Sequence, residues 1–566
     1  MTSPDRSPLE RLADGLPGAA VGVTLTGDRI TVAGAPGMAV PQKPADWLRH
    51  EAPTVWPNTP HGEARPTLLF GILRDSGTSA GKRPLDGVLR DALEERLPGD
   101  SPEQQQVLAT AMKSKFWTTA GSGKAKDDGK RYLLPLHARL PLSFGQEKAK
   151  GGKTEFGYKM FRGTVLPFLL SGTSGTVDTD LLERFLAEFR SEEDLTELDR
   201  AVLKIAADIA PDTTGPDASM LLSRSKDVLG RLQDAKGGFC GPSLDQFRLD
   251  LEQVLTMDLP RRDRIHQITL LLALHLTTRL YRASIVLSKR LDGCIALFPS
   301  GGIGGLPESG CAVRCCGQPT GCDLAGRIRF RVGSGAFRSV KLTEPCVASY
   351  RDMTSNYLLP LPVTISCANF AKEALAAAGG PALASADLEG LRSALEGDST
   401  LRARFDAVAQ LLAVCRLYQL RGNSLANREE FQDSGLPGLH RLRMTLLESR
   451  RTTMRKEGRD VVHQLAKEVR SGRLIGNNGN AAVFFELDED MLHLLVRLVC
   501  GDRLISYGDF LKGLLRYGIA PQDTAEEQLL QSGLARLGML ERYADSDESA
   551  YVSYPDTNDD EDDEDA

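Results

Sequence analysis

The segment from Arg261 to Leu291 constrains the fold of this chain more strongly than the rest of its sequence. It is the most apolar helix-forming stretch, with basic residues at both ends and an uncharged run from Ile265 to Thr278 between them. That run is shorter than the roughly 18–20 residues that cross a bilayer, and it contains His266 and His275. We therefore predict a buried helix at the hub of the core, with both histidines satisfied inside it.

Helical periodicity continues on both sides of this segment. Apolar residues recur at the spacing of one helix face over 181–189, and again over 388–418 and 461–469. The 566 residues are enough for three or four packed units, and the 41% hydrophobic and 26% charged residues are ordinary for a folded protein. The predicted fold class is α+β, mainly α-helical and multidomain.

Two regions break the helical pattern and predict β structure. Near the N-terminus, the β-branched runs 21–25 and 29–33 predict a hairpin, and the apolar run 68–73 predicts a buried strand. Residues 291–370 hold a glycine run, seven of the ten cysteines and alternating strand patterns. The expected segments are an N-terminal β-hairpin arm and mixed module with a basic loop (1–175), a helical domain (176–290), a Cys- and Gly-rich β module (291–370), a helical domain (371–485), a winged-helix-like domain (486–555) and a disordered acidic tail (556–566).

The most specific local pattern lies in residues 486–555 and predicts three short helices followed by a β-hairpin. Glycine and proline separate the three apolar helix faces, and Ser506-x-x-Asp509 has the spacing of a helix N-cap. Two strand patterns follow, at 540–543 and 550–554. This order resembles a winged helix-turn-helix domain, in which the third helix enters the major groove of DNA.

The charge of the third predicted helix argues against sequence-specific contact with DNA. The helix begins at Thr524, carries Glu526 and Glu527, and offers only Arg536 as a base. A polyanion would therefore be repelled by this helix. We expect the domain to dock on proteins rather than to read DNA.

Arginine-rich stretches elsewhere predict contact with a nucleic-acid backbone. The alternation over 327–332 places three arginines on one face of a strand, and residues 440–474 hold ten bases against four acids. Such contacts bind phosphate without reading sequence and weaken with salt. The alternative interpretations are a half-buried strand and a solvated helix. The candidate contact residues are Arg327, Arg329, Arg331, Arg338, Lys341, Arg450, Arg451 and Arg455.

A dense cysteine cluster raises the question of a metal site. Four thiolates can hold a structural zinc ion in tetrahedral geometry, with Cys294, Cys346 or Cys367 as an alternative ligand. The Cys-x2-Cys spacing of zinc knuckles is absent from the cluster, so free thiols and redox chemistry are the other interpretations. No other cofactor is expected. The four clustered residues are Cys311, Cys315, Cys316 and Cys322.

No catalytic motif fits its local context. Residues 121–124 lack the first glycine and the Ser/Thr of a phosphate-binding loop, and the Gly-x-Ser-x-Gly spelling at 77–81 lacks an adjoining strand and helix. The sequence contains no His-Glu-x-x-His. We expect a protein that is not an enzyme, with a divergent metal-dependent enzyme as an alternative.

The termini and the cysteine content predict a cytoplasmic location. The first thirty residues carry three acids and no apolar core of signal-peptide type. Ten cysteines in this length suit a reducing compartment. Residues 556–566 hold eight acids and no base, which predicts either a solubilising tail or a mask for the basic surface.

The layout resembles accessory subunits of bacterial phage-defence operons tied to DNA methylation or phosphorothioation. The resemblance rests on a helical core flanked by a winged helix, with the pattern Leu534-x-x-Leu537-Gly538-x-Leu540-Glu541 entering the wing. It implies a subunit that docks on other proteins, such as an ATPase or a nuclease, and contacts duplex DNA. A winged-helix transcriptional regulator is the alternative.

Overall fold

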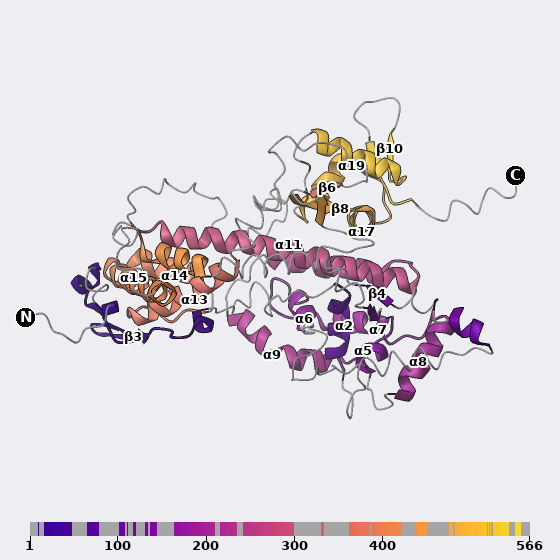
Figure 1. Cartoon of the computed structure of the whole chain (residues 1–566). Coiled ribbons are helices and arrows are strands. Elements are labelled where there is room, and N and C mark those ends of the chain that lie inside the picture. Colours follow the sequence, from indigo (N-terminus) through magenta and orange to yellow (C-terminus); the bar gives the residue numbers. More distant parts are fainter. Residues whose placement is uncertain are drawn as a thin grey trace, which may run out of the picture.

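In the computed structural model the chain is mainly α-helical with small sheets beside the helices, as expected for the α+β class (Figure 1). The part of the chain that the structure describes comprises residues 9–10, 16–47, 65–77, 101–107, 110, 117–119, 131–133, 136–143, 164–209, 215–234, 241–298, 330–332, 361–384, 387–421, 436–449, 475–478, 482–517, 519, 521, 524–542 and 550–555.

Helix α11, Arg261–Ile295, is the axis along which the other elements gather (Figure 1). Its 35 residues span roughly 52 Å at about 1.5 Å per residue. Helix α10, Gly241–Thr256, packs along α11, and helices from later in the chain also contact it. Ile268 and Leu272 in its uncharged middle are fully buried. The predicted central helix is confirmed.

The predicted N-terminal hairpin is present, and a third strand extends it. Strands β1, Val23–Thr26, and β2, Arg29–Val32, are antiparallel and joined by the turn at Gly27. Gly27 has a φ of +61°, in the left-handed region that favours glycine. Strand β3, Ala35–Ala39, pairs with β2 and was not predicted from the sequence. Two 3-10 helices flank the sheet, η1 Pro17–Val21 and η2 Pro44–Trp47.

Residues 68–73, predicted as a buried strand, are helical. They belong to α2, Arg65–Asp75. Leu69, Ile72 and Leu73 are buried at the i, i+3, i+4 spacing that puts them on one helix face. The prediction was wrong because a short apolar run has the same composition in a buried helix and in a buried strand.

The helix predicted over 181–189 forms as α7, and further helices occupy the segment expected to be a helical domain. Asp178 caps α7 by accepting a hydrogen bond from Leu181 N at 3.0 Å. The other elements described before α10 are β4 Trp117–Thr119, β5 Arg131–Leu133, α5 Arg139–Ser143, α6 Val165–Leu169, α7 Thr179–Glu188, α8 Glu197–Ile209 and α9 Ala218–Asp234.

Both ends of the segment expected to be β-rich, 291–370, are helical. Residues 291–295 complete α11, and residues 361–370 begin α13, Leu361–Ala377. Nearly every side chain of α13 is buried, so its sequence lacks the polar face that marks an amphipathic helix. The next helices are α14 Leu388–Gly397, α15 Ser399–Arg421 and a helical segment over 438–449.

Residues 488–555, which we name the C-terminal unit, contain three helices and a three-stranded antiparallel sheet in the order β10-β11-β9. The helices and the last two strands lie within the ranges expected from the sequence. Its elements are α17 Glu489–Cys500, β9 Ile505–Ser506, α18 Tyr507–Leu515, α19 Thr524–Arg536, β10 Leu540–Arg542 and β11 Ala550–Val552.

A second small sheet lies beside this unit and joins distant parts of the chain. Its order is β6-β8-β7, with β6, Phe330–Val332, parallel to β8, Ala482–Leu487, and β7, Ile475–Asn478, antiparallel to β8. Strand β8 runs directly into α17. Among the described residues, every helix is too short or too polar to span a membrane.

Candidate functional site

The C-terminal unit is held in shape by caps that the sequence signals. Ser506 Oγ accepts from Asp509 N at 3.1 Å and donates to Asp509 Oδ2 at 2.8 Å, so the predicted cap of α18 is confirmed. Gly501, with a φ of +59°, ends α17, and Gly538, with a φ of +70°, ends α19. These caps fix the angles between the three helices.

The basic side chains on the described part of α19 and its hairpin are engaged inside the unit. Arg536 Nη2 pairs with Glu489 Oε1 of α17 at 2.5 Å. Arg542 Nη2 donates to Gln531 Oε1 at 2.8 Å. Phosphate contact by either guanidinium would replace these bonds, so α19 is poorly suited to a polyanion.

Helix α19 also contacts a strand from far away in the sequence. Strand β6 lies against α19, as Figure 1 shows near the top of the molecule. The register of the parallel pair sets Arg331 of β6 beside Glu486 of β8. The third helix of the unit is therefore partly occupied by the chain itself.

Two polar contacts seat α17 on the central helices. Gln253 Nε2 of α10 donates to the Arg497 carbonyl at 2.7 Å. His266 Nε2 of α11 lies 3.5 Å from Asp490 Oδ2. The His266 side chain is 40% exposed, so the expectation of a core histidine is wrong at this position. It lies at the edge of the interface, where the helix face turns toward solvent.

A buried polar triad of Asp250, His275 and Tyr517 completes the same interface. The carboxylate of Asp250 on α10 is 1% exposed and accepts from His275 Nε2 at 2.8 Å and from the Tyr517 hydroxyl at 3.0 Å. Gln246 Nε2 donates to it at 2.6 Å. Burial, followed by the nearby Asp250 charge, raises the pKa of Tyr517. His275 is the satisfied core histidine that was predicted.

Sequence reasoning missed the partners of His275. Asp250 stands among polar residues of an amphipathic helix, and Tyr517 follows α18 by two residues, so neither position has a motif. The usable signal was the combination of a histidine in an apolar helix with the rule that buried polar groups are hydrogen-bonded. That rule predicts that a partner exists but does not identify it.

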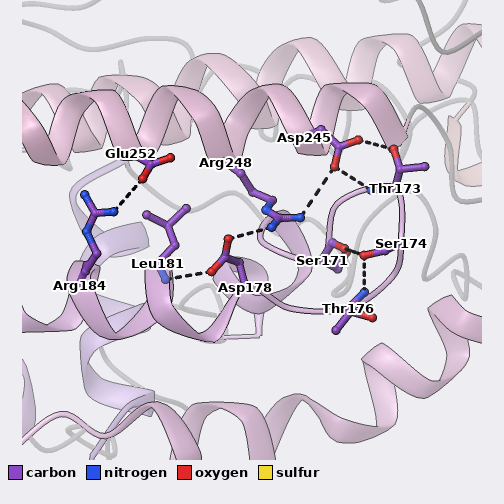
Figure 2. Close-up of polar contacts among 10 residues, drawn as sticks. All are labelled: Ser171, Thr173, Ser174, Thr176, Asp178, Leu181, Arg184, Asp245, Arg248 and Glu252. Carbon is purple, nitrogen blue, oxygen red and sulfur yellow. Dashed lines mark hydrogen bonds and ion pairs between the residues drawn. The ribbon is translucent and has the colours of Figure 1, made fainter.

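Figure 2 shows a second polar network, which fixes the loop between α6 and α7 on α10. Thr173 N donates to Asp245 Oδ1 at 2.9 Å, and its hydroxyl donates to the other oxygen. Arg248 Nη2 pairs with Asp178 Oδ2 at 2.7 Å. The hydrogen bond from Leu181 N, and then Arg248, lowers the pKa of Asp178. The charged groups pair with one another, so the network is a clamp for the loop.

Most predicted site residues lie outside the residues that the structure describes. These include seven of the eight candidate phosphate contacts, and of the eighth, Arg331, the structure gives only the backbone on β6. The clustered cysteines, the tail 556–566 and the helices over 461–469 are also outside it. The positions outside are Arg327, Arg329, Arg338, Lys341, Arg450, Arg451, Arg455, Cys311, Cys315, Cys316 and Cys322.

The cysteines that the structure describes are buried thiols. Cys294 Sγ lies 3.3 Å from the Leu388 carbonyl, and Cys367 Sγ lies 3.9 Å from the Leu439 carbonyl. Burial raises the pKa of each thiol to about 12, so neither is a thiolate at neutral pH. Within the described ranges, no three His, Cys, Asp or Glu side chains gather as a metal site would require.

Comparison of the chain with protein-family models and with curated protein sequences finds no match. Its function is therefore inferred from the sequence and from the geometry of the C-terminal unit.

Proposed function

We propose that this protein is a non-enzymatic accessory subunit of a bacterial, DNA-associated anti-phage defence complex. In this proposal the C-terminal unit is a winged helix-turn-helix domain that docks on partner proteins, and the basic stretches 327–341 and 440–474 contact the DNA backbone. The long helix α11 is the scaffold that connects the two activities. An ATPase or a nuclease is the kind of partner that such a subunit would serve.

The observation that carries the proposal is the order of elements in the C-terminal unit. The order α17-β9-α18-α19-β10-β11, with the sheet β10-β11-β9, resembles that of a winged helix and supports this proposal. In such domains the helix after the turn is the one presented to a partner. Here that helix is α19.

The charges of α19 favour protein as its partner. Arg536 and Arg542 are bonded within the unit, and β6 already lies against the helix. Its exposed side chains include Gln528 and Ser532, which are neutral and hydrogen-bonding. Neutral polar surfaces suit protein contacts, whereas DNA binding draws most of its affinity from positive charge.

The proposed docking of α19 on a partner protein is tested by changing the charge of this helix. Gln528→Arg with Ser532→Arg would strengthen DNA binding if α19 entered a groove, and would abolish capture of a partner if α19 docks on protein. Capture is measured by co-purification with proteins encoded alongside, and binding by anisotropy of a labelled duplex. Glu197→Arg, at an exposed position on α8, is the matched control for added charge.

The proposed contact of the basic stretches with DNA is tested by comparing the full chain with one that ends at residue 555. A cut at 485 is unsuitable, because it would divide strand β8. If the acidic tail masks the basic stretches, the shorter chain binds duplex more tightly at about 50 mM salt and loses affinity at about 200 mM. Substituting Arg327, Arg329 and Arg331 by Gln would remove that gain, and Arg200→Gln would not.

The alternatives predict other results in the same assays. A transcriptional regulator would keep a sequence preference at about 200 mM salt. A divergent enzyme would carry a metal detectable in the purified protein. Equal binding by both chains at low salt would contradict the masking step, and absence of binding by both would contradict the DNA half.

A further inference from the structure

Arg416 is a buried guanidinium with few partners. It lies on α15 and is 4% exposed. Among the residues that the structure describes, no carboxylate pairs with it, and its one hydrogen bond runs from Nη1 to Gln419 Oε1 at 3.4 Å. A guanidinium carries five N–H donors, so most of its hydrogen-bonding capacity is unused.

The single bond that Arg416 makes is also a shared one. Gln419 Oε1 accepts from Trp47 Nε1 at the shorter distance of 2.9 Å. Trp47 Nε1 and Gln419 Nε2 both donate to the Pro41 carbonyl, at 3.0 Å and 2.7 Å. The amide of Gln419 therefore serves mainly to hold η2 against α15, and its hydrogen bond to the Arg416 guanidinium is the longest of its contacts.

One complete edge of the guanidinium is open. Arg416 Nε is buried and has no hydrogen-bond partner, and Nη2 on the same edge makes no hydrogen bond within the described chain. These two nitrogens point in parallel and match the two oxygens of a carboxylate. Other arginines of the described chain also have a buried nitrogen without a partner, but Arg264 and Arg443, for example, form hydrogen bonds through both Nη atoms. Among the described residues Arg416 instead leaves Nε and Nη2 unbonded together, and two parallel donors in the interior favour an acceptor beside them.

The surroundings of Arg416 compensate its burial only in part. The ring of Trp47 lies with its centroid 5.5 Å from the guanidinium carbon, within the range of a cation–π contact. Burial lowers the pKa of Arg416. By contrast, the buried guanidinium of Arg261 donates to the backbone carbonyls of Leu136, Ser191 and Glu193, among others. All three nitrogens of the Arg261 guanidinium are thus hydrogen-bonded.

We propose that Arg416, Gln419 and the face of Trp47 form a binding site for a small free carboxylate of the size of acetate. The carboxylate accepts side-on from Nε and Nη2 of Arg416, and its alkyl group lies toward the indole. The ligand is expected to be small, because Arg416 is almost completely buried and a nucleotide or a peptide would need a wider opening. This site lies where η2 meets α15, and the Trp47 ring also contacts Phe370 of α13. It is independent of the proposed function.

The test uses the fluorescence of Trp47, since the chain has only three tryptophans. In the full-length Trp56→Phe, Trp117→Phe protein, acetate is titrated against chloride at constant ionic strength. A saturable emission change with acetate is expected. Arg416→Lys keeps the charge but loses the side-on edge, and should weaken acetate binding by about tenfold or more. Arg421→Lys, on the same helix but paired with Glu448, should leave it unchanged.

Three results would overturn the site. They are an emission change that follows chloride equally, an acetate response that does not saturate, and equal acetate affinity in the Arg416→Lys and Arg421→Lys proteins. Calorimetric titration of acetate into the unsubstituted chain gives the same decision if a substituted protein fails to fold. Detectable saturable heat supports the site, and its absence contradicts it.

Discussion

The hydroxyl of Tyr517 donates to the buried carboxylate of Asp250 at 3.0 Å and so ties the C-terminal unit to the central helices. The two residues are 267 positions apart in the chain. His275 and Gln246 bind the same carboxylate. Because a buried carboxylate tolerates few geometries, this triad fixes the orientation in which α17 and α18 dock on α10 and α11.

Tyr517→Phe should lower the free energy of unfolding by about 1–3 kcal/mol, because it removes a donor from a buried carboxylate and leaves a lone pair unsatisfied. Urea unfolding measures the loss. Compared with the unsubstituted protein, the variant should show a larger increase in amide hydrogen exchange in α17 and α18 than in α13, because the substitution loosens the interface that α17 and α18 form. Tyr554→Phe is the control, because its ring contacts with Arg497 and His493 are retained. Equal losses in the two proteins would contradict the role of the triad.

Substitution of Arg261 should be among the most destabilising changes in the first half of the chain. Its guanidinium, 7% exposed, donates to the carbonyls of Leu136 at 3.1 Å and Glu193 at 3.3 Å, and also to Ser191 and Glu188. Arg261→Met strands these carbonyls and should cost about 3 kcal/mol or more. Thermal unfolding measures the change. Arg262→Met, next along the chain and exposed, should change stability by less than about 0.5 kcal/mol.

The stability of the protein should fall as the pH drops from about 7 to 5. Burial is the main cause that lowers the pKa of His137, His440 and His493 below the usual value of 6.5. The unfolded chain then binds more protons than the native state in the window below 6.5, so the stabilisation is complete above that pH and is lost as the pH falls through the window. Urea unfolding at a series of pH values measures the slope.

His137 offers a direct check of this pH dependence. Its Nδ1 accepts from Arg139 N at 3.1 Å, and Nε2 lies 3.2 Å from the Arg190 carbonyl, so the neutral ring satisfies both contacts. His137→Gln keeps a donor and an acceptor but cannot titrate, and should reduce the slope. An unchanged slope in the His137 variant would contradict the assignment.

The sequence predicted the elements whose signals are local. The N-cap at Ser506 and the glycines that end α17 and α19 are short-range signals, and each of these elements formed as expected. The apolar run 68–73 was misassigned, because burial on all sides hides the helical period. The Tyr517–Asp250 contact and the β6–β8 pair were beyond prediction, since both depend on tertiary packing between distant segments.

The loop clamp shown in Figure 2 depends on a glycine at its edge. The collision that a side chain would cause there can be distinguished from backbone strain alone. Gly172 has a φ of +60°, and a Cβ there would lie 2.5 Å from Asp245 Oδ1 and 2.7 Å from Arg248 Nη1. Gly34 has a φ of +73°, with nothing within 4 Å of an added Cβ. Both alanine variants therefore incur left-handed strain of roughly 1 kcal/mol, but only Gly172→Ala collides with the clamp.

Gly172→Ala should lower the free energy of unfolding by about 1–3 kcal/mol more than Gly34→Ala, because Asp245 must give up its bonds to Thr173 to make room. Urea unfolding of both variants gives the difference. In the Gly172 variant, Arg248→Ala should then cost less than it does in the unsubstituted chain, since the clamp is already open. Equal losses for the two glycines, with an unchanged cost of Arg248→Ala, would mean that the network contributes no specific stability to the loop.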